Sequence, residues 1–155
     1  MRLEHFQLID RVERLDRDGK TIVCRCQVPA ESTVFDGHFP GHPLLPGTLM
    51  IEAMAQACGL MVLAMFDFRR MPLLIGVDKA RVRGMVKPGA SLEAEGRLVQ
   101  EGAGYVAAEG HLTLEGKRVA EAEIRLGTLP FPSESLRDEA RKFARLCSQH
   151  SAASY

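Results

Sequence analysis

Residues 35–66, FDGHFPGHPLLPGTLMIEAMAQACGLMVLAMF, decide the fold of this 155-residue chain. Their first part contains three glycines and three prolines. Because glycine frees the backbone while proline fixes φ, we expect an irregular but rigid loop that aims a side chain. From Thr48 to about Phe66 the stretch is apolar on almost every side, which is typical of a buried helix. The stretch therefore predicts a long central helix preceded by a stiff loop.

A polar stripe interrupts this helix. Glu52 and Gln56 stand four residues apart, hence on one face, and Gly59 continues that face. Apolar surroundings disfavour a charged carboxylate, so we expect Glu52 to hold a proton near neutral pH. His38 in the loop adds a side chain that exchanges protons in the same pH range. At the helix start near Gly47, unpaired backbone N–H groups could bind a developing oxyanion.

Residues 38–56 carry a family motif. The run His-Phe-Pro-Gly-x-Pro-Leu-x-Pro-Gly-x-Leu-x-x-Glu-Ala-x-Ala-Gln resembles the active-site segment of (3R)-hydroxyacyl-[acyl-carrier-protein] dehydratases of the FabZ type. Residues 5–12, 76–83 and 86–89 extend the resemblance, which covers roughly residues 4 to 127. It implies an α+β hot-dog fold, in which a curved antiparallel sheet wraps around one long buried helix.

The resemblance also implies an activity and the residues that perform it. The activity is dehydration of (3R)-hydroxyacyl thioesters on acyl carrier protein to trans-2-enoyl thioesters, in fatty acid or related acyl-chain biosynthesis. His38 takes the position of the catalytic histidine, Glu52 that of the catalytic carboxylate, and Gly47 that of the backbone donor to the thioester oxygen. Gln56 either binds substrate and orients Glu52, or only satisfies the helix packing. Relatives that also isomerise the double bond usually carry aspartate in place of Glu52, so simple dehydration is expected.

The chemistry needs these residue types. Removing a weakly acidic proton from carbon 2 requires a base, the enolate-like oxygen requires a hydrogen-bond donor, and the departing hydroxide requires an acid. Neutral His38 suits the base and protonated Glu52 suits the acid. Two other function classes stay open: a hot-dog acyl thioesterase, and a non-catalytic partner of acyl carrier protein. Neither of them explains His38 and Glu52 together at this spacing.

The amino-acid composition limits the kinds of partner and cofactor that the protein is expected to bind. Acidic and basic residues balance at 20 each and only 6% of residues are aromatic, so a nucleic-acid partner is not expected. The N-terminus lacks a signal-peptide pattern, and polar residues interrupt the apolar helix, which predicts a soluble, cytoplasmic protein without a membrane span. The four cysteines lack zinc spacing and are expected to be free thiols. We therefore expect no metal and no cofactor beyond the phosphopantetheine that carries the substrate.

Two kinds of partner are expected. Lys79, Arg81 and Arg83 alternate along a predicted strand, so they should share one face. That face is either ordinary solvated surface or a contact for the acidic acyl carrier protein. The second partner is another copy of the chain, because the resemblance implies dimers with sites at the interface, and further association into a trimer of dimers is compatible with it.

The chain is expected to hold one domain, residues 1–127, and a C-terminal extension, residues 128–155. In the extension, Ser135 and Asp138 could cap a short amphipathic helix, and residues 148–155 are expected to fray. The strands predicted from alternation and turn signals span residues 10–15, 20–28, 73–86, 91–101, 105–115 and 117–127.

Overall fold

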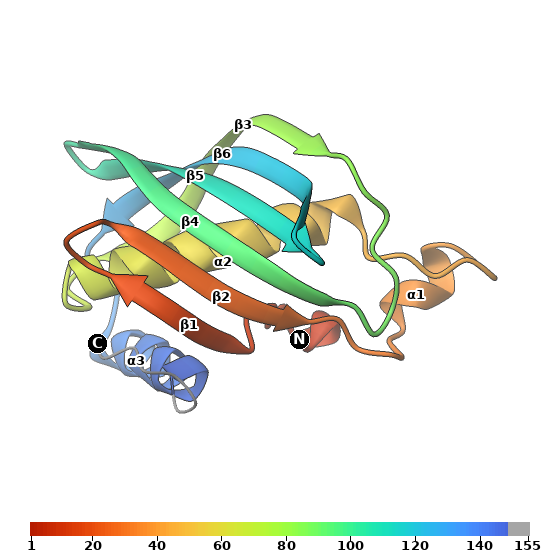
Figure 1. The fold of residues 1–155 in the computed structure, drawn as a ribbon. Coiled ribbons are helices and arrows are strands. Elements are labelled where there is room, and N and C mark those ends of the chain that lie inside the picture. The colour runs from red at the N-terminus through yellow and green to blue at the C-terminus, as the bar shows by residue number, and fades with distance from the viewer. Residues whose placement is uncertain (149–155) are drawn as a thin grey trace.

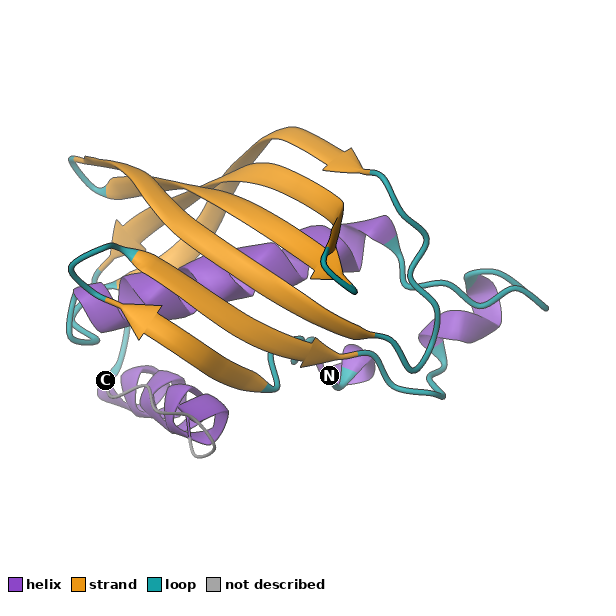
Figure 2. Cartoon of the chain, viewed as in Figure 1, coloured by secondary structure: helices purple, strands orange, loops and turns teal. Residues whose placement is uncertain are grey.

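A computed structural model describes residues 1–148 of the chain. Six antiparallel strands form one sheet in the order β1-β2-β4-β5-β6-β3, and the sheet curls around helix α2 (Figures 1 and 2). The α+β class and the wrapped central helix expected from the sequence are thereby confirmed. The strands are β1 (Arg11–Asp16), β2 (Thr21–Gln27), β3 (Met71–Val82), β4 (Ser91–Gly102), β5 (Tyr105–Leu114) and β6 (Lys117–Leu129). The helices are η1 (Leu3–His5), α1 (Val34–Gly37), α2 (Gly47–Met65) and α3 (Glu134–Ser148).

The core lies between α2 and the concave face of the sheet. Side chains alternate along β4 and β5, so every second residue points at the helix. Two glycines let the helix approach closely: a Cβ on Gly110 would lie 2.9 Å from Met54 Cβ, and one on Gly96 would lie 3.0 Å from Cys58 Sγ. Burial of this apolar interface is the main favourable contribution to folding.

The central helix is buried apart from a few positions on one side. Most of α2 is buried, but Ile51, Glu52 and Gln56 are only half-buried. The polar stripe predicted on this otherwise buried helix thus lies on the side that the curled sheet does not cover. By length and apolar composition α2 could span a membrane, yet 72% of its most apolar window is buried inside the domain. It is the core helix of the fold.

Strand β3 ends four residues before the predicted position. Beyond Val82 the N–H groups of Arg83 and Gly84 both donate to the carbonyl of Val119, at 2.7 and 3.2 Å, and the chain leaves the sheet. Val86 is fully buried and its carbonyl accepts a hydrogen bond from Leu45 N–H at 2.8 Å. Val86 is therefore buried where the chain meets the loop before α2, and it does not belong to the sheet.

The C-terminal segment contains a helix, but its cap differs from the prediction. Ser133 Oγ accepts a hydrogen bond from Leu136 N–H at 3.2 Å, so Ser133 caps α3 and Ser135 lies inside it. Ala144 and Cys147 are buried, and the Cys147 thiol donates to the carbonyl of Ile9 at 3.7 Å. Helix α3 therefore docks on the domain beside β1 (Figure 1). The domain boundary at residue 127 stays a prediction, and the predicted frayed tail falls almost entirely outside the described residues.

Candidate active site

His38 follows directly on α1, in the glycine- and proline-rich loop that leads to α2. Its N–H donates to the carbonyl of Phe35 at 3.3 Å, and its carbonyl accepts from Leu44 N–H at 2.8 Å. The imidazole is half-buried and stacks on the ring of Phe39, with 4.2 Å between centroids. Backbone hydrogen bonds thus hold the loop in a defined shape, and it extends beyond the N-terminal end of α2 (Figure 1).

Glu52 is held by Gln56, one turn further along α2. Gln56 Nε2 donates to Glu52 Oε1 at 2.9 Å and to the carbonyl of Phe6 at 2.7 Å. Gln56 Oε1 accepts from Leu8 N–H at 3.0 Å. Both ends of the amide are therefore engaged, and the N-terminal segment fixes the amide that orients the carboxylate. Spacing along α2 indicates the pair of residues 52 and 56, but nothing in the sequence indicates Phe6 or Leu8.

Gly47 is the first residue of α2. Within residues 1–148 its N–H has no hydrogen-bond partner, as expected for a donor in the first helical turn. A Cβ on Gly47 would lie 3.1 Å from Val82 Cγ2, so glycine allows β3 to pass close to the helix start. The N–H and the positive end of the helix dipole are available to a partly negative oxygen.

A cleft of about 330 Å³ runs along the half-exposed side of α2. Glu52 and Gln56 are its polar residues, and the other lining side chains are apolar. The lining residues are Glu52, Ala55, Gln56, Gly59, Leu60, Leu63, Pro72, Leu73, Leu74, Leu126 and Phe143. A carboxylate at one part of an otherwise apolar cleft suits a ligand with a reactive polar group and a hydrocarbon chain.

One chain does not bring all the predicted site residues together. Glu52 and Gln56 share the cleft, whereas His38 does not line it. Within residues 1–148 no hydrogen bond joins the His38 imidazole to the Glu52 carboxylate. Within the described single chain His38 and Glu52 therefore lie apart, and their joint action at a dimer interface stays a prediction.

The predicted basic cluster on β3 is largely paired with acids. Lys79 Nζ lies 2.6 Å from Glu123 Oε1, Arg83 lies 2.6 Å from Glu121 Oε1, and Arg81 lies 3.8 Å from the same oxygen. The Glu123 carboxylate raises the pKa of Lys79, and Arg83 lowers the pKa of Glu121. Lys79 has a positive φ at a register shift between β3 and β6, so simple alternation does not hold there. Glu109 lies in the same group of side chains and Arg118 also pairs with Glu121, so nearby acids offset much of the positive charge of the three cations.

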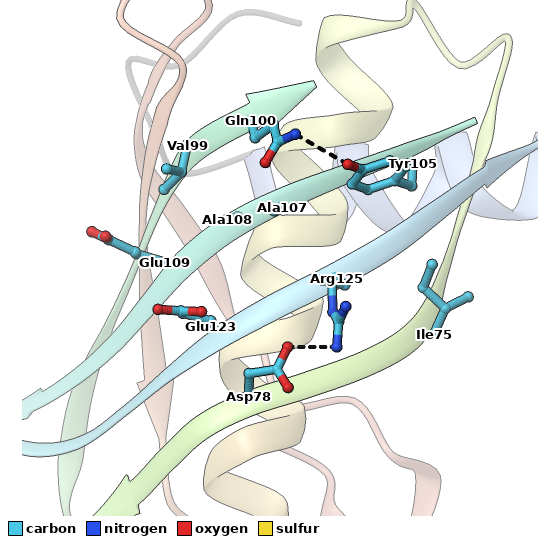
Figure 3. A pocket seen from close by; sticks show the side chains of 10 residues that line it. All are labelled: Ile75, Asp78, Val99, Gln100, Tyr105, Ala107, Ala108, Glu109, Glu123 and Arg125. Carbon is cyan, nitrogen blue, oxygen red and sulfur yellow. Dashed lines mark hydrogen bonds and ion pairs between the residues drawn. The ribbon is translucent and has the colours of Figure 1, made fainter. Parts of the chain in front are cut away.

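A second hollow, of about 550 Å³, lies on the outer face of the sheet, away from α2 (Figure 3). It crosses β3, β6, β5 and β4. Arg125 and Asp78 form an ion pair at 2.6 Å in it, and Gln100 Nε2 donates to the Tyr105 hydroxyl at 3.1 Å (Figure 3). It contains neither His38 nor Glu52, so it is not the site predicted from the sequence.

Thiol chemistry does not fit the cysteines. All four are free and buried. Burial raises the pKa of Cys58 to about 12 and that of Cys147 to about 11, so both stay protonated and unreactive at neutral pH. In the part of the chain that the structure describes, no three His, Cys, Asp or Glu side chains are grouped so as to hold a metal ion.

A comparison with known families assigns this architecture. The FabA-like domain matches residues 2–123. This range contains the loop, the central helix, the whole of strands β1 to β5 and the first half of β6. This chain belongs to the FabA-like family. The match covers His38, Gly47, Glu52 and Gln56, while α3 lies beyond it.

Relatives of this FabA-like chain agree with the assignment. The chain is 40% identical over 120 residues to 3-hydroxyacyl-[acyl-carrier-protein] dehydratase FabZ of Enterococcus faecalis, covering 77% of this chain and 84% of that protein. Among solved structures, the dehydratase heterocomplex ApeI:P from Xenorhabdus doucetiae superposes with a TM-score of 0.63 at 20% identity, over 84% of this chain and 86% of that one. A hypothetical thioesterase from Streptococcus pneumoniae, solved with coenzyme A, gives 0.61 at 17% identity, over 79% and 90%. These two structures share the fold only.

Proposed function

We propose that this chain dehydrates (3R)-hydroxyacyl thioesters carried on acyl carrier protein to trans-2-enoyl thioesters, in fatty acid or related acyl-chain biosynthesis. The observation that carries the proposal is the 40% identity to a FabZ dehydratase across most of both chains. The cleft beside Glu52 supports it, because its apolar walls suit a fatty acyl chain. The hot-dog fold alone does not, since the pneumococcal thioesterase shares it.

Each step has a candidate residue. His38 takes the proton from carbon 2, and the Gly47 N–H donates to the thioester oxygen as negative charge develops there. Glu52 protonates the departing hydroxyl, directly or through water, and Gln56 holds the carboxylate in place. The chemistry uses side chains and backbone of the protein, and we propose that it needs no metal or organic cofactor besides the substrate's own phosphopantetheine arm.

A second copy of the chain would complete the site. Strand β3 is an edge of the sheet and pairs only with β6 within residues 1–148. It exposes Leu73, Leu74 and Ile75, and Ile75 is 58% exposed. An apolar edge strand is a template for pairing with another chain. We propose a two-fold dimer through this edge, in which His38 of one protomer acts with Glu52 of its partner, and a trimer of dimers is a further proposal.

An assay with three substrates tests the function. The purified protein is incubated separately with 3-hydroxyacyl, trans-2-enoyl and saturated acyl thioesters of the same chain length. We expect reversible interconversion of the first two without added metal or nucleotide, unchanged by a chelator. Hydrolysis of the saturated thioester would favour a thioesterase. Binding without turnover of any substrate would favour a non-catalytic partner of the carrier protein.

Replacing Gln56 by methionine tests its positioning role. We expect kcat to fall by about tenfold or more, because Glu52 loses the donor that orients it. The free energy of unfolding should fall by about 1–3 kcal/mol, since the buried Leu8 loses its hydrogen-bond acceptor. Gln100→Met, which removes one hydrogen bond on the outer face of the sheet, is the matched control. Lower stability with unchanged kcat would show that Gln56 only anchors the N-terminal segment.

The cluster formed by Lys79, Arg81 and Arg83 remains our candidate contact for acyl carrier protein. Reversing the three charges to glutamate should raise KM for carrier-protein substrates by about tenfold and flatten its salt dependence, because surface charges steer encounter. Turnover on a pantetheine-length mimic should be nearly unchanged. The matched control reverses three other paired surface cations: Arg17, Lys20 and Arg69. If both triple variants raised KM for carrier-protein substrates equally, the cluster would be ordinary solvated surface and not a contact for acyl carrier protein.

The fold also supports a location. The long apolar helix is the core of the domain, and the four cysteines are free thiols, as is usual in a reducing compartment. We therefore propose that the enzyme acts in the cytoplasm, where acyl carrier protein would deliver its substrate.

A further inference from the structure

The cleft beside Glu52 has a direction. Glu52, Gln56, Gly59 and Leu63 follow at intervals of four, three and four residues, so they form one stripe along α2. At 1.5 Å rise per residue, the stripe from Glu52 to Leu63 is about 16 Å long. Its polar residues lie at the N-terminal end, and the lining beyond them is apolar. A thioester that reacts at Glu52 would therefore extend its acyl chain toward the C-terminal end of α2.

A side chain from α3 contributes to the far part of this cleft. Phe143 lines it, although α3 lies outside the residues that match the FabA-like domain. Helix α3 lies next to β1, on the side of the domain where α2 has its C-terminal end (Figure 1). Its neighbours Arg141 and Ala144 share a smaller hollow with Ala64 and Phe68, at the C-terminal end of α2, which places Phe143 near the same end.

Helix α3 is anchored firmly enough to act as a wall. Ala144 and Cys147 are almost completely buried, and the Cys147 thiol is hydrogen-bonded to the carbonyl of Ile9. The Arg141 guanidinium lies over the Phe68 ring, with Cζ 5.9 Å from the ring centroid. Phe143 itself is partly buried and packs against the core. These contacts on both sides of Phe143 hold its ring in the lining of the cleft.

We propose that Phe143 forms the end wall of the acyl cleft and limits the length of the acyl chain that reacts at Glu52. This inference rests on the proposed dehydratase function. The extension after the family domain would thus set substrate length, while His38, Gly47 and Glu52 perform the chemistry. Phe143 is a specificity-determining residue in this scheme, since it contacts the methyl end of the chain and not the reacting atoms.

The size of the Phe143 ring allows an estimate of how far its replacement should shift the preferred acyl-chain length. Each methylene that enters apolar surroundings favours binding by about fourfold. Phe143→Ala opens space for additional methylenes, so kcat/KM for substrates two to four carbons longer than the preferred one should rise at least about tenfold relative to the preferred one. Phe143→Trp should shift the preference toward shorter chains.

A substrate ladder tests the wall. kcat/KM is measured for 3-hydroxyacyl thioesters of increasing length with the wild type, Phe143→Ala, Phe143→Trp and Leu146→Ala. Leu146 lies on the same helix but is 62% exposed and outside the cleft, so its variant controls for changes in α3 that do not affect the wall. We expect opposite shifts from the two Phe143 variants and an unchanged profile from Leu146→Ala. A uniform loss, or an unchanged length profile in variants that unfold at the wild-type temperature, would overturn the proposal. If Phe143→Ala does not fold, Phe143→Leu and Phe143→Trp still give the comparison.

A binding measurement separates this proposal from the proposed function. Unreactive amide analogues of saturated acyl-pantetheine thioesters, in the same lengths, are titrated by calorimetry into each variant. Suppose that the wild type dehydrates none of the substrates, and that substitutions at residue 143 still shift the length dependence of affinity. The proposal on Phe143 is then supported and the dehydratase function is refuted. If dehydration proceeds and neither length profile shifts, the dehydratase function stands and the wall falls.

Discussion

Replacing His38 by alanine or Glu52 by glutamine is expected to lower kcat on 3-hydroxyacyl thioesters by about 10²–10⁴-fold for each substitution. The imidazole and the carboxylate supply different proton transfers in one reaction, so neither can substitute for the other. The fold should survive both changes, because both side chains are only half-buried. Glutamine at position 52 also keeps an oxygen that can accept from Gln56. The measurement is steady-state kinetics beside thermal unfolding.

His42→Ala is the matched control for the histidine. His42 lies in the same loop and is exposed, and its backbone carbonyl and N–H bond to Phe39 whatever its side chain is. We expect near wild-type kcat from this variant. A Glu52→Gln protein that retained near-normal turnover would mean that another group protonates the leaving hydroxyl.

Mixing the two inactive proteins should restore activity if each site spans two protomers. After reversible dissociation and reassociation, half of the dimers from a 1:1 mixture contain one chain of each kind. In such a dimer one site has lost both groups, while the other has an intact His38 and an intact Glu52. About a quarter of all sites should therefore be complete, and activity should recover to about a quarter of the wild-type level.

Two controls accompany the mixing experiment. Each variant taken alone through dissociation and reassociation should stay inactive, and tagged chains should establish that mixed dimers form. Complementation that fails despite verified mixed dimers would show that each site is built from a single chain. The loop with His38 would then have to close on the Glu52 cleft of its own protomer.

The helix and its polar stripe are predictable from local sequence. Amphipathic spacing indicates the stripe of Glu52, Gln56 and Gly59, and these three residues line one cleft in the structure. The spacing does not indicate which residues form hydrogen bonds with the polar side chains of this stripe. Gln56 forms hydrogen bonds with Phe6 and Leu8, which lie 50 and 48 residues away in the sequence, and only the folded chain brings them together.

The strands show the same division. Turn signals and alternation locate all six strands, and the hairpin around Asp18 and Gly19 joins β1 and β2 as expected. The end of β3 is misplaced because Val86 looks like a strand residue, although its burial comes from the junction with Leu45. Lys79 departs from alternation because a bulge at this point inserts an extra residue. An apolar residue in the sequence indicates burial, but it does not indicate which segment of the chain covers it.

The sequence by itself determines the class of the fold, the central helix and the identity of the candidate acid, base and oxyanion donor, because these depend on periodicity and on a contiguous motif. Only the tertiary structure decides which side of α2 stays open, that His38 lies apart from Glu52 in one chain, and that α3 brings Phe143 to the cleft. Those features depend on how segments distant in sequence pack. An amphipathic pattern specifies that a helix face is covered, whereas the long-range contacts of the folded chain select what covers it.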